Sequence, residues 1–550
     1  MHPVIKKILK KRGISTAEEA VEFLSYKPRT IYDPFLMKDM DRAVDRLLAA
    51  VDRGDRICIY GDYDVDGVTS VALMKSLFAC LGSPCAYYIP SRFDEGYGLH
   101  REALDTIKKA GADIVITVDC GCTSVAEVAY AKQIGLEILI TDHHEPGPER
   151  PDCIVLDPHR KDCPYPFKDL AGVGVAFKLF QAVALAMGLP KTVLTRNMDL
   201  LCIGTVADVV PLLDENRSLV KYGLRSLRLT QRPGLIRLME DLGLDRSRVQ
   251  SQDIAFSLAP PLNAAGRMGD AALAARLLLT EEEEKARIFS QNILEKNRER
   301  KSLQEAIFTK ARGIIDREQG EREILILKLA DAHEGVIGIV AGKLKDRFRK
   351  PTLILVRSTD KLWKGTGRST EDVDLFRLLN AHASLFTRFG GHKAACGFTI
   401  EENRIEELEK ALEEDMRRLR QNLPHGQQAV KKDVDLRAED VSLELCDLLE
   451  ILEPFGKGNE RPVFSFSAWP TEMSRMGSEG QYLRFRAGLE KGREIEGVDF
   501  SYAAESENIL QQALVSASPV CLTGELEARM WKDRKTLQVK LTGPVEDKHE

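Results

Sequence analysis

The run Cys-Ile-Tyr-Gly-Asp-Tyr-Asp-Val-Asp-Gly at residues 58–67 is the feature that most constrains this chain. An apolar, strand-like stretch leads directly into three aspartates, Asp62, Asp64 and Asp66, and Gly67 closes the run. Carboxylates placed this densely repel one another unless a positive charge lies between them. A divalent metal ion is the usual partner, because hard cations prefer oxygen ligands.

Two other interpretations compete with a metal site. An EF-hand loop also begins Asp-x-Asp-x-Asp-Gly, but it needs a helix before it and a Glu at its twelfth position. Here that position is Leu73, and the preceding residues 56–61 are strand-like, so the EF-hand interpretation fails twice. A solvated acidic turn is the second alternative, and only segments further along the chain can decide against it.

Length and composition describe a globular protein of several domains. A chain of 550 residues is too long for one core, so roughly two to four domains are expected. No apolar run approaches the roughly 18 residues of a membrane helix, and the basic start lacks the features of a signal peptide. The eleven cysteines show no zinc-type CxxC pairs. Free thiols and a cytoplasmic location are therefore predicted.

The charge distribution leaves nucleic acid open as a partner. The net charge of −6 argues against a protein coated in basic surface, but the distribution matters more than the sum. Residues 340–393 hold twelve Lys or Arg against five Asp or Glu, a local balance of +7. This segment is either a phosphate-facing patch or an ordinary basic surface.

Strand-like and helical stretches alternate through the first half of the chain. This rhythm predicts a mostly parallel sheet covered on both faces, with ligands bound at the carboxyl ends of its strands. The expected strands are 57–60, 86–90, 113–118, 137–141 and 153–156, and helices are expected at 69–81, 102–110 and 124–134.

The second half contains three further regions. Apolar spacing by three and four predicts one long helix at 281–317, which either bridges two lobes or packs as an ordinary helix; its charged middle, 296–301, is expected to be exposed. A second α/β region follows at about 323–422. The remainder predicts a small antiparallel barrel, either an OB-fold or another small β domain, with strands at 463–466, 482–487, 496–500, 520–530 and 536–541.

Acids and imidazoles recur at the ends of other apolar runs. Asp119 follows the strand at 114–118, Asp142-His143-His144 follows the strand at 138–141, and Asp208 follows an apolar helix or strand. In a parallel sheet such ends lie along one edge. Mixed carboxylate and imidazole ligands suit Mn²⁺, with Mg²⁺ also plausible. The ligands outnumber the needs of one metal, so a two-metal site suited to phosphoryl displacement is predicted.

Motifs throughout the chain resemble those of one family. They are IYGDYDVDGVTS, SRFDEGYGLH, ITVDCG, ITDHHE, GTVADVVPLLDENR, PPLNAAGRMG, HEGVIGIVAGKL, GTGRS, GGHKAACGF and LEPFGKGNERPVF. In this order they are similar to the motifs of the DHH phosphoesterase superfamily and, within it, of the bacterial RecJ single-strand exonucleases. The resemblance covers essentially the whole length and implies a DHH domain, a DHH-associated domain and an OB-fold.

The resemblance implies a ligand set and catalytic roles. The metal ligands would be Asp64, Asp66, Asp119, His143 and Asp208, with Asp119 bridging two Mn²⁺ or Mg²⁺ ions. His144 would orient the site or touch the scissile phosphate, and Asp142 or Asp62 would fix a ligating imidazole. One position departs from the pattern: many members have a His where this chain has Tyr60, so a water or Asp62 would fill that corner.

Further residues are expected to bind substrate. Asn263 and Arg267 would contact the phosphate backbone, since the planar fork of Arg pairs two phosphate oxygens. Glycines around Arg368, Ser369 and His392 permit close approach of backbone N–H groups to phosphate, which predicts a clamp for phosphates or the 5′ end. Tyr97 and Trp531 are candidates for base stacking, against a core role for each.

These observations predict a 5′→3′ exonuclease that hydrolyses single-stranded DNA to mononucleotides by a two-metal activated water, in recombination and repair. The alternatives are a nanoRNase or cyclic-dinucleotide phosphodiesterase of the same superfamily, and a non-catalytic DHH scaffold that binds DNA. The resemblance also implies a helicase and a single-strand-binding protein as partners, and a monomer is expected. The expected domains are a helical segment at 1–50, a DHH domain at 51–280, the connecting helix at 281–317, a DHH-associated domain at 318–425 and an OB-fold at 429–550.

Overall fold

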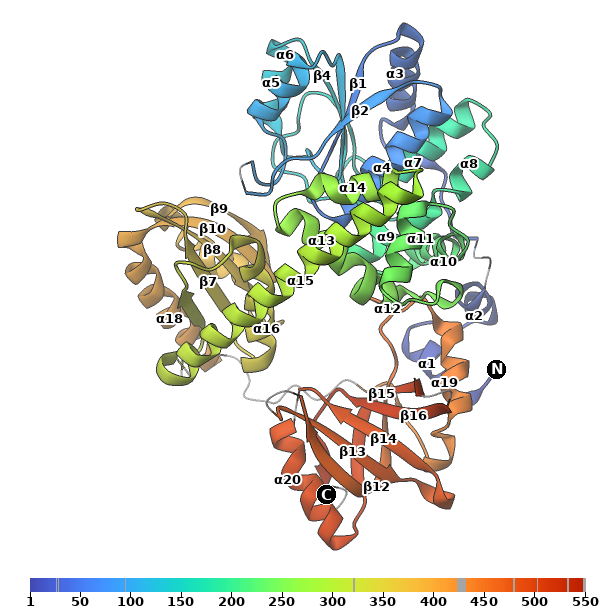
Figure 1. The fold of residues 1–550 in the computed structure, drawn as a ribbon, viewed down its shortest axis with the longest axis vertical. Coiled ribbons are helices and arrows are strands. Elements are labelled where there is room, and N and C mark those ends of the chain that lie inside the picture. Colours follow the sequence, from blue (N-terminus) through green and yellow to red (C-terminus); the bar gives the residue numbers. More distant parts are fainter. Residues whose placement is uncertain are drawn as a thin grey trace. The chain divides into compact units, whose positions relative to one another are not determined.

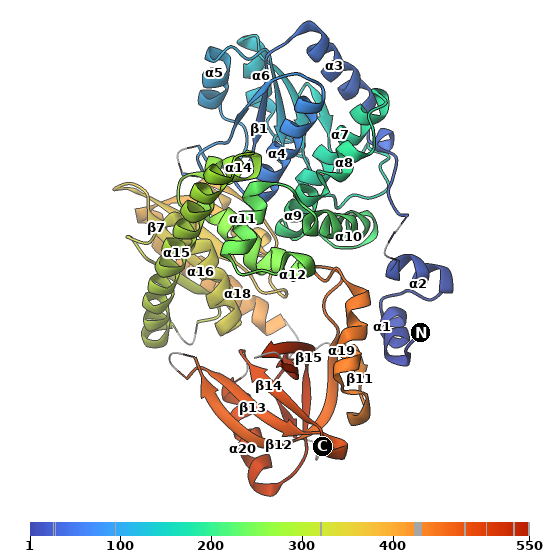
Figure 2. The ribbon, with the colours of Figure 1, turned by 45° about the vertical axis from the view of Figure 1, so that its right-hand side comes forward.

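The computed structural model divides into two compact units, each described here by itself (Figures 1 and 2). The larger unit comprises Ile31–Val210 and Asp214–His425, and the smaller unit comprises Met1–Thr30, Pro211–Leu213 and Gly426–Glu550. The described residues are 1–25, 27, 29–93, 95–319, 322–422, 432–477, 480–501, 503–531 and 534–547. Among them, no helix is both long and apolar enough to cross a membrane.

The first sheet of the larger unit is parallel throughout, as predicted. Its order is β2-β1-β3-β4-β5, with β1 Ile57–Gly61, β2 Cys85–Tyr88, β3 Ile114–Val118, β4 Glu137–Thr141 and β5 Ile154–Leu156. Every residue of β1 and β3 is buried, which is typical of a sheet covered on both faces. From β1 the chain goes to β2 on one side and then crosses back over β1 to β3 on the other. The crevice for a ligand therefore lies at the carboxyl ends of β1 and β3.

Helices cover both faces of this sheet (Figure 1). On one face, α5 (Arg101–Lys109) and α6 (Val125–Gln133) bury Leu104 and Val128 in a core that includes Tyr60, Val115 and Ile138. On the other lie α3 (Met40–Arg53), α4 (Val65–Cys80) and α7 (Gly172–Ala186). The chain continues through α8 Thr192–Thr195, α9 Met198–Ala207, α10 Asp214–Arg228, α11 Pro233–Asp241, α12 Ser251–Asp253, α13 Ala259–Arg267 and α14 Ala271–Leu279.

The predicted long helix is α15, Glu283–Ile314. Its charged middle was expected to be exposed, and this is wrong for Arg300, which is only 8% exposed. The Arg300 guanidinium donates to Asn297 Oδ1 at 2.9 Å and to Gln304 Oε1 at 3.0 Å. These partners lie three residues before and four residues after Arg300, so one helix face supplies acceptors that make burial of the cation tolerable.

The second sheet of the larger unit has the order β6-β7-β8-β10-β9. Only the β6–β7 pair is parallel among its pairings. Gly365 on β8 is dictated by packing, because a Cβ there would lie 2.2 Å from Phe398 Cζ. Its elements are β6 Leu325–Lys328, α16 Glu334–Phe348, β7 Thr352–Arg357, β8 Leu362–Arg368, α17 Leu375–Asn380, β9 Phe386–His392, β10 Ala395–Glu401 and α18 Ile405–Asn422.

The smaller unit is built around a closed barrel. The strand β12 (Val463–Met476) pairs with both β13 (Tyr482–Gly488) and β15 (Val520–Trp531), which closes the sheet on itself. The expectation of an antiparallel barrel needs one correction, since β14 (Glu494–Asp499) and β16 (Arg534–Leu541) pair in parallel. The unit also contains β11 Val434–Asp435, α19 Leu443–Leu449, α20 Ala503–Ser516 and β17 Glu546–Asp547.

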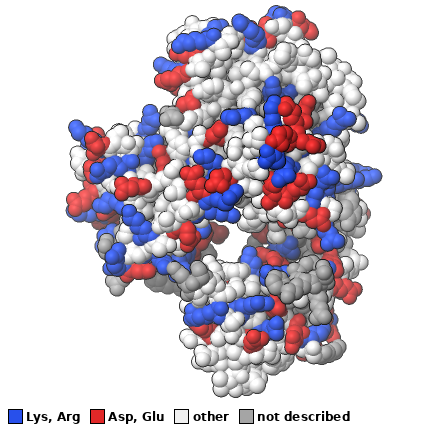
Figure 3. Space-filling view, viewed as in Figure 1, with Lys and Arg blue, Asp and Glu red and all other residues white. Residues whose placement is uncertain are grey.

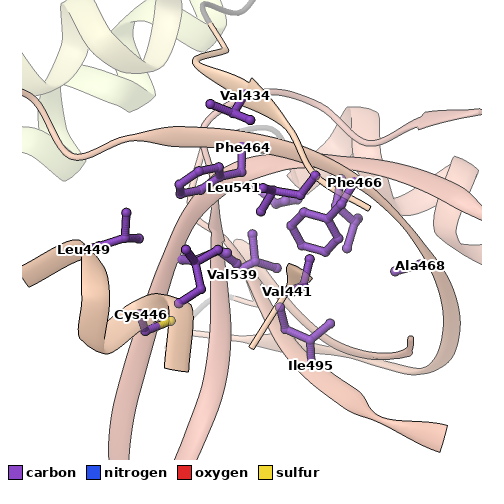
Figure 4. Close-up of a cluster of buried hydrophobic side chains, with 14 of the residues drawn as sticks. Val434, Val441, Cys446, Leu449, Phe464, Phe466, Ala468, Ile495, Val539 and Leu541 are labelled. Atoms are coloured by element: carbon purple, nitrogen blue, oxygen red, sulfur yellow. The ribbon is translucent and has the colours of Figure 1, made fainter. Parts of the chain in front are cut away.

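The core of the smaller unit also takes in the start of the chain. Side chains such as Phe464 and Leu541 fill the barrel (Figure 4), and Ile5 and Ile8 of α1 (Pro3–Lys11) join the same cluster with no exposed surface. The short helix α2 (Ala17–Leu24) belongs to this unit, whereas α3 belongs to the larger one. The domain limits expected from the sequence stay predictions.

A buried ion pair ties four segments of the larger unit together. Lys178 Nζ on α7 lies 2.6 Å from Glu215 Oε1 on α10, and both side chains are fully buried. Lys178 also donates to the Tyr32 carbonyl oxygen at 2.8 Å, and the Tyr165 hydroxyl donates to Glu215 Oε2 at 2.6 Å. Removing one charge would leave the other buried without compensation.

We therefore expect Lys178→Met to destabilise the larger unit by about 3–5 kcal/mol. Urea unfolding followed by tryptophan fluorescence and circular dichroism would measure the shift. Arg287→Ala is the matched control, because Arg287 pairs with Glu284 at an exposed site, and such pairs contribute about 0–1 kcal/mol. Equal unfolding midpoints for Lys178→Met and the wild type would contradict the expectation.

Candidate metal centre

The turn after β1 is shaped by a close backbone approach. The helix α4 begins at Val65, and the side chain of its N-cap, Asp64, accepts a hydrogen bond from the Gly67 N–H at 3.1 Å. A Cβ on Gly67 would lie 2.5 Å from the Asp62 carbonyl oxygen, so only glycine fits. This turn brings the carboxylates of Asp62, Asp64 and Asp66 to the end of β1.

Asp66 is held by the N-terminus of α7. Its two carboxylate oxygens accept hydrogen bonds from the Gly172 N–H at 2.7 Å and the Val173 N–H at 2.8 Å. A Cβ on Gly172 would lie 2.5 Å from Asp119 Oδ1, so glycine there lets the two acids approach. This role of Gly172 was not predicted from the sequence, where a glycine opening an apolar helix was the available signal.

Asp119 follows β3 with φ of 63°, a left-handed conformation that Asp adopts more readily than most residues. His143 follows β4, and its Nε2 lies 3.1 Å from Asp119 Oδ1, 3.6 Å from Asp208 Oδ2 and 3.8 Å from Asp66 Oδ2. Asp208 is the C-cap of α9, so of the two alternatives left open for it, the structure has a helix end rather than a strand end. The site therefore draws on three strand ends and one helix end.

The acids and imidazoles form three groups in which potential ligand atoms all lie within 4.8 Å of one another. Asp119 and His143 each belong to two groups, so the groups overlap and could hold more than one ion. All five ligands predicted from the sequence are brought together, along with Asp62 and His144. The groups are Asp119, His143 and His144; Asp66, His143 and Asp208; and Asp62, Asp64 and Asp119.

Burial and crowding disfavour the charged forms of these acids. Burial raises the pKa of Asp119 well above its usual range, and the neighbouring charges of Asp66 and Asp64 add to this. For the same two reasons, burial and the charge of Asp64, the pKa of Asp62 is well above its usual range and that of Asp66 is raised to about 7. Cations bound among these carboxylates would reverse the effect.

The two imidazoles have opposite protonation preferences. Burial, with the nearby charge of His144, lowers the pKa of His143 to about 3, and a neutral imidazole is the form that binds a metal. Burial would also lower the pKa of His144, but a hydrogen bond to Asp142 raises it to about 9. His144 Nδ1 lies 2.8 Å from Asp142 Oδ1, so Asp142 orients His144.

The donor atoms fit a divalent cation. Asp119 Oδ1, Asp62 Oδ1 and His143 Nε2 are buried with no hydrogen-bond partner among the described residues. A buried polar atom left unsatisfied costs about 1–3 kcal/mol, so a cation bound by these atoms would stabilise the site. Oxygen and imidazole donors without thiolates favour Mn²⁺ or Mg²⁺.

Tyr60 takes no part in this centre. Its hydroxyl donates to the Gly98 carbonyl oxygen at 2.9 Å, and its ring stacks on Tyr88 with the centroids 5.5 Å apart. Burial raises the pKa of this phenol far above its usual range, so it stays neutral. Many family members have a His at the position of Tyr60, and a water or Asp62 was expected to take its place. Of these, Asp62 belongs to a candidate ligand group.

Three arginines converge near the acidic groups. The charges of Arg92 and Arg368, after burial, lower the pKa of Arg267 to about 10, and Arg92 acts on Arg368 in the same direction. Arg267 Nη1 donates to the Gly335 carbonyl oxygen at 3.3 Å, and the Arg92 guanidinium lies 5.0 Å from the centroid of the Tyr63 ring. Arg92 was missed in the sequence, although it stands in the quoted motif SRFDEGYGLH. Mutually repelling cations of this kind suit an anionic ligand.

Other predicted substrate residues have internal hydrogen bonds. Asn263 Oδ1 accepts from the Val65 N–H at 3.1 Å and so supports the start of α4. The Ser369 hydroxyl is buried and donates to the Val373 carbonyl oxygen at 2.9 Å. His392 is exposed at the end of β9. The substrate roles of these three residues stay predictions.

The candidate stacking residues differ in what the structure describes. Tyr97 is 46% exposed, and its hydroxyl lies 2.9 Å from His144 Nδ1. An exposed ring beside the acidic groups is compatible with base stacking, and that role stays a prediction. The side chain of Trp531 lies outside the described part of the chain.

The basic segment 340–393 is not a uniform patch. Several of its cations have acidic partners, including Lys364 with Glu334 at 2.9 Å and Arg357 with Glu402 at 3.0 Å. Figure 3 shows Lys and Arg interspersed with Asp and Glu across the face it views. Several cations of the segment are therefore paired with acids, and Arg368 is the member of the segment that belongs to the converging arginines.

Comparison with protein families gives three matches along the chain. The DHH family N-terminal domain matches residues 56–205, the DHHA1 domain matches residues 321–418, and the RecJ OB domain matches residues 432–543. The parallel sheet with acids at its switch point and the second, mixed sheet thus define a protein of the DHH class that also carries an OB domain.

Individual relatives agree over most of the chain. The single-stranded-DNA-specific exonuclease RecJ of Bacillus subtilis is 37% identical over 98% of this chain and 67% of that protein. RecJ of Salmonella typhimurium is 34% identical over 84% of this chain and 83% of that protein. The crystal structure of Thermus thermophilus RecJ in complex with Mn²⁺ superimposes with a TM-score of 0.83 at 29% identity, covering 100% of this chain and 76% of that one. The chain belongs to the RecJ family.

The glycine at the start of α7 gives a test of the geometry. We expect Gly172→Ala to displace Asp119 and to weaken Mn²⁺ binding by about 10–100-fold, as changes around metal ligands do. Isothermal titration calorimetry would measure the binding, and circular dichroism the fold. Gly342→Ala is the control, because it also lies in a helix but a Cβ there meets nothing within 4 Å. Unchanged Mn²⁺ binding by Gly172→Ala would contradict the assignment.

Proposed function

We propose that this protein is a metal-dependent exonuclease that hydrolyses single-stranded DNA from its 5′ end to mononucleotides, in DNA recombination and repair. The observation that carries the proposal is the gathering of Asp64, Asp66, Asp119, His143 and Asp208 into groups with ligand atoms within 4.8 Å, in a chain of the RecJ family. Two Mn²⁺ or Mg²⁺ ions bound there would activate a water and stabilise the oxygens of an in-line displacement at phosphorus.

The residues of the chain have distinct parts in this reaction. Asp119 belongs to two of the three groups of candidate ligands, and we infer that it would be shared by the two ions. The N–H groups of α7 fix the carboxylate of Asp66, so its orientation does not depend on the ions. Asp142 holds His144 in its cationic form beside the site, where a cation would stabilise the extra charge that develops on the phosphoryl oxygens.

The arginine cluster would hold the substrate phosphates. Arg92, Arg267 and Arg368 repel one another, and each planar fork can pair two phosphate oxygens. We propose that they bind phosphates adjacent to the cleaved bond or at the 5′ end, with Asn263, Ser369 and His392 nearby. Tyr97 would stack on a base. A helicase and a single-strand-binding protein are proposed partners, and the monomeric state and cytoplasmic location stay predictions.

Removal of the central acid tests catalysis. We expect Asp119→Ala to reduce hydrolysis to the background rate while leaving single-strand binding measurable, because the arginines and the OB domain remain. EDTA should abolish the activity of the wild type, and Mn²⁺ or Mg²⁺ should restore it. Rates on fluorescent single strands and binding by fluorescence anisotropy provide the readouts. Turnover by Asp119→Ala close to that of the wild type would contradict the metal assignment.

Substrate choice tests the polarity and the class of enzyme. Single strands labelled at the 5′ or the 3′ end, as DNA and RNA, should be compared with duplex DNA and with a dinucleotide. A 5′-labelled DNA strand should release labelled mononucleotide first, whereas a 3′-labelled strand should shorten progressively. Preference for the dinucleotide would instead favour the nanoRNase or cyclic-dinucleotide phosphodiesterase alternative.

The salt dependence of binding tests the arginines. For each arginine that neutralises one phosphate, replacement by Ala should reduce the slope of log K against log salt by about 0.7, the value for single strands. The variants Arg92→Ala, Arg267→Ala and Arg368→Ala should each show this change. Arg298→Ala is the control, because Arg298 is exposed on α15 and pairs with Glu295. Slopes equal to that of the wild type would contradict a phosphate-binding role.

A further inference from the structure

A short segment directly after Asp208 belongs to a different unit from Asp208 itself. Pro211–Leu213, here named the strap, is part of the smaller unit, although the residues on both sides of it belong to the larger one. Asp208 is three residues before the strap, and Asp214 follows it at once. The strap is therefore joined to Asp208, a proposed metal ligand, by a very short stretch of backbone.

The strap is held by a loop of the smaller unit, Phe455–Glu460, here named the clamp loop. The Leu212 N–H donates to the Lys457 carbonyl oxygen at 2.7 Å, and Leu212 is only 2% exposed. The loop lies so close that a Cβ on Gly456 would be 2.7 Å from Leu212 Cδ1. A Cβ on Gly458 would be 3.1 Å from Leu213 Cδ1, so both glycines make room for the strap.

The clamp loop is itself well anchored. Asn459 is 1% exposed, and its Nδ2 donates to the carbonyl oxygens of Leu452 at 3.0 Å and Pro454 at 2.6 Å. Arg12, at the end of α1, donates to Asn459 Oδ1 and to the Glu460 carbonyl oxygen. Phe455 is buried in the core of the smaller unit. The loop is therefore a rigid support for the strap.

The residues on either side of the strap are also fixed, and their backbone is strained. Val209 has φ of 61° and Asp214 has φ of 45°, and a β-branched residue such as Val rarely adopts the left-handed region. Before the strap, Asp208 caps α9; after it, Glu215 is locked to the buried Lys178. Strain of this kind persists only when the surroundings hold it. Only three residues separate Leu212 from Asp208, so a displaced Leu212 would strain the backbone that follows Asp208.

We propose that Leu212 and the clamp loop are positioning elements for the metal ligand Asp208, so that the smaller unit sets the geometry of the metal centre. This proposal rests on the proposed function, because it takes Asp208 as a ligand. The proposal goes beyond the proposed function because it gives the segment LEPFGKGNE, which leads into the barrel, a role in positioning Asp208. Loss of the strap's anchor should weaken metal binding and lower kcat while leaving the KM for single strands unchanged.

The test uses the full-length chain and two kinds of readout. Leu212→Ala removes the anchor, and Gly456→Val displaces it without removing a core side chain. We expect both to weaken Mn²⁺ binding, measured by isothermal titration calorimetry, by about 10-fold or more, with a matching fall in kcat. Leu212→Met, which keeps the buried volume, should behave as the wild type.

Leu510→Ala is the matched control, because Leu510 is a fully buried leucine of the same unit on α20 and lies outside the clamp loop. Wild-type Mn²⁺ binding and kcat in both Leu212→Ala and Gly456→Val would overturn the proposal, as would an equal loss in Leu510→Ala, which would indicate general destabilisation. Asp119→Ala distinguishes a failure of the proposed metal centre from a failure of the positioning role of the strap. If Asp119→Ala binds Mn²⁺ as the wild type does, the assignment of the metal centre is wrong, whatever the strap variants do.

Discussion

Repulsion among buried carboxylates at the ends of β1 and β3 is the constraint around which the larger unit is arranged. Asp62, Asp66 and Asp119 are each at most 4% exposed, and their pKa values are raised by burial and by one another. The fold keeps such a group together by several local devices. A glycine allows the turn after β1, and the N–H groups of α7 satisfy both oxygens of Asp66. Cations among these acids would supply the remaining compensation.

The same constraint organises the surroundings of the site. Burial lowers the pKa of His143 to about 3, whereas the hydrogen bond to Asp142 raises that of His144 to about 9, so the adjacent imidazoles have opposite protonation preferences. Near the acids, Arg92, Arg267 and Arg368 also repel one another. A group of acids beside a group of arginines would be complementary to the cations and the phosphate of one metal–phosphate complex.

Much of the fold was readable from local pattern. The five strands of the first sheet, α15 and the five main barrel strands lie within a few residues of their predicted positions, except that β12 runs on well past its expected end to Met476. Apolar strands and helices with distinct periods carry that information. The prediction that Arg300 is exposed failed because it rested on the charge of that side chain alone. Its hydrogen-bond partners Asn297 and Gln304 make burial possible. The prediction that all barrel strands pair antiparallel failed at β14 and β16 for a related reason. The direction in which two strands pair depends on the path of the chain between them.

The sequence by itself determined the family and the candidate ligands: acids and imidazoles follow apolar runs, and their motifs stand in the order of the RecJ family. Only the tertiary structure decided that β1 and β3 flank the switch point, that α7 supports Asp66, and that Asp208 arrives from a helix. It also placed α1 in the barrel core and the strap under the clamp loop. The physical reason is that periodicity and turn chemistry are local properties of a chain. Contacts between residues hundreds of positions apart, such as Leu212 with Lys457, arise from packing that no local pattern records.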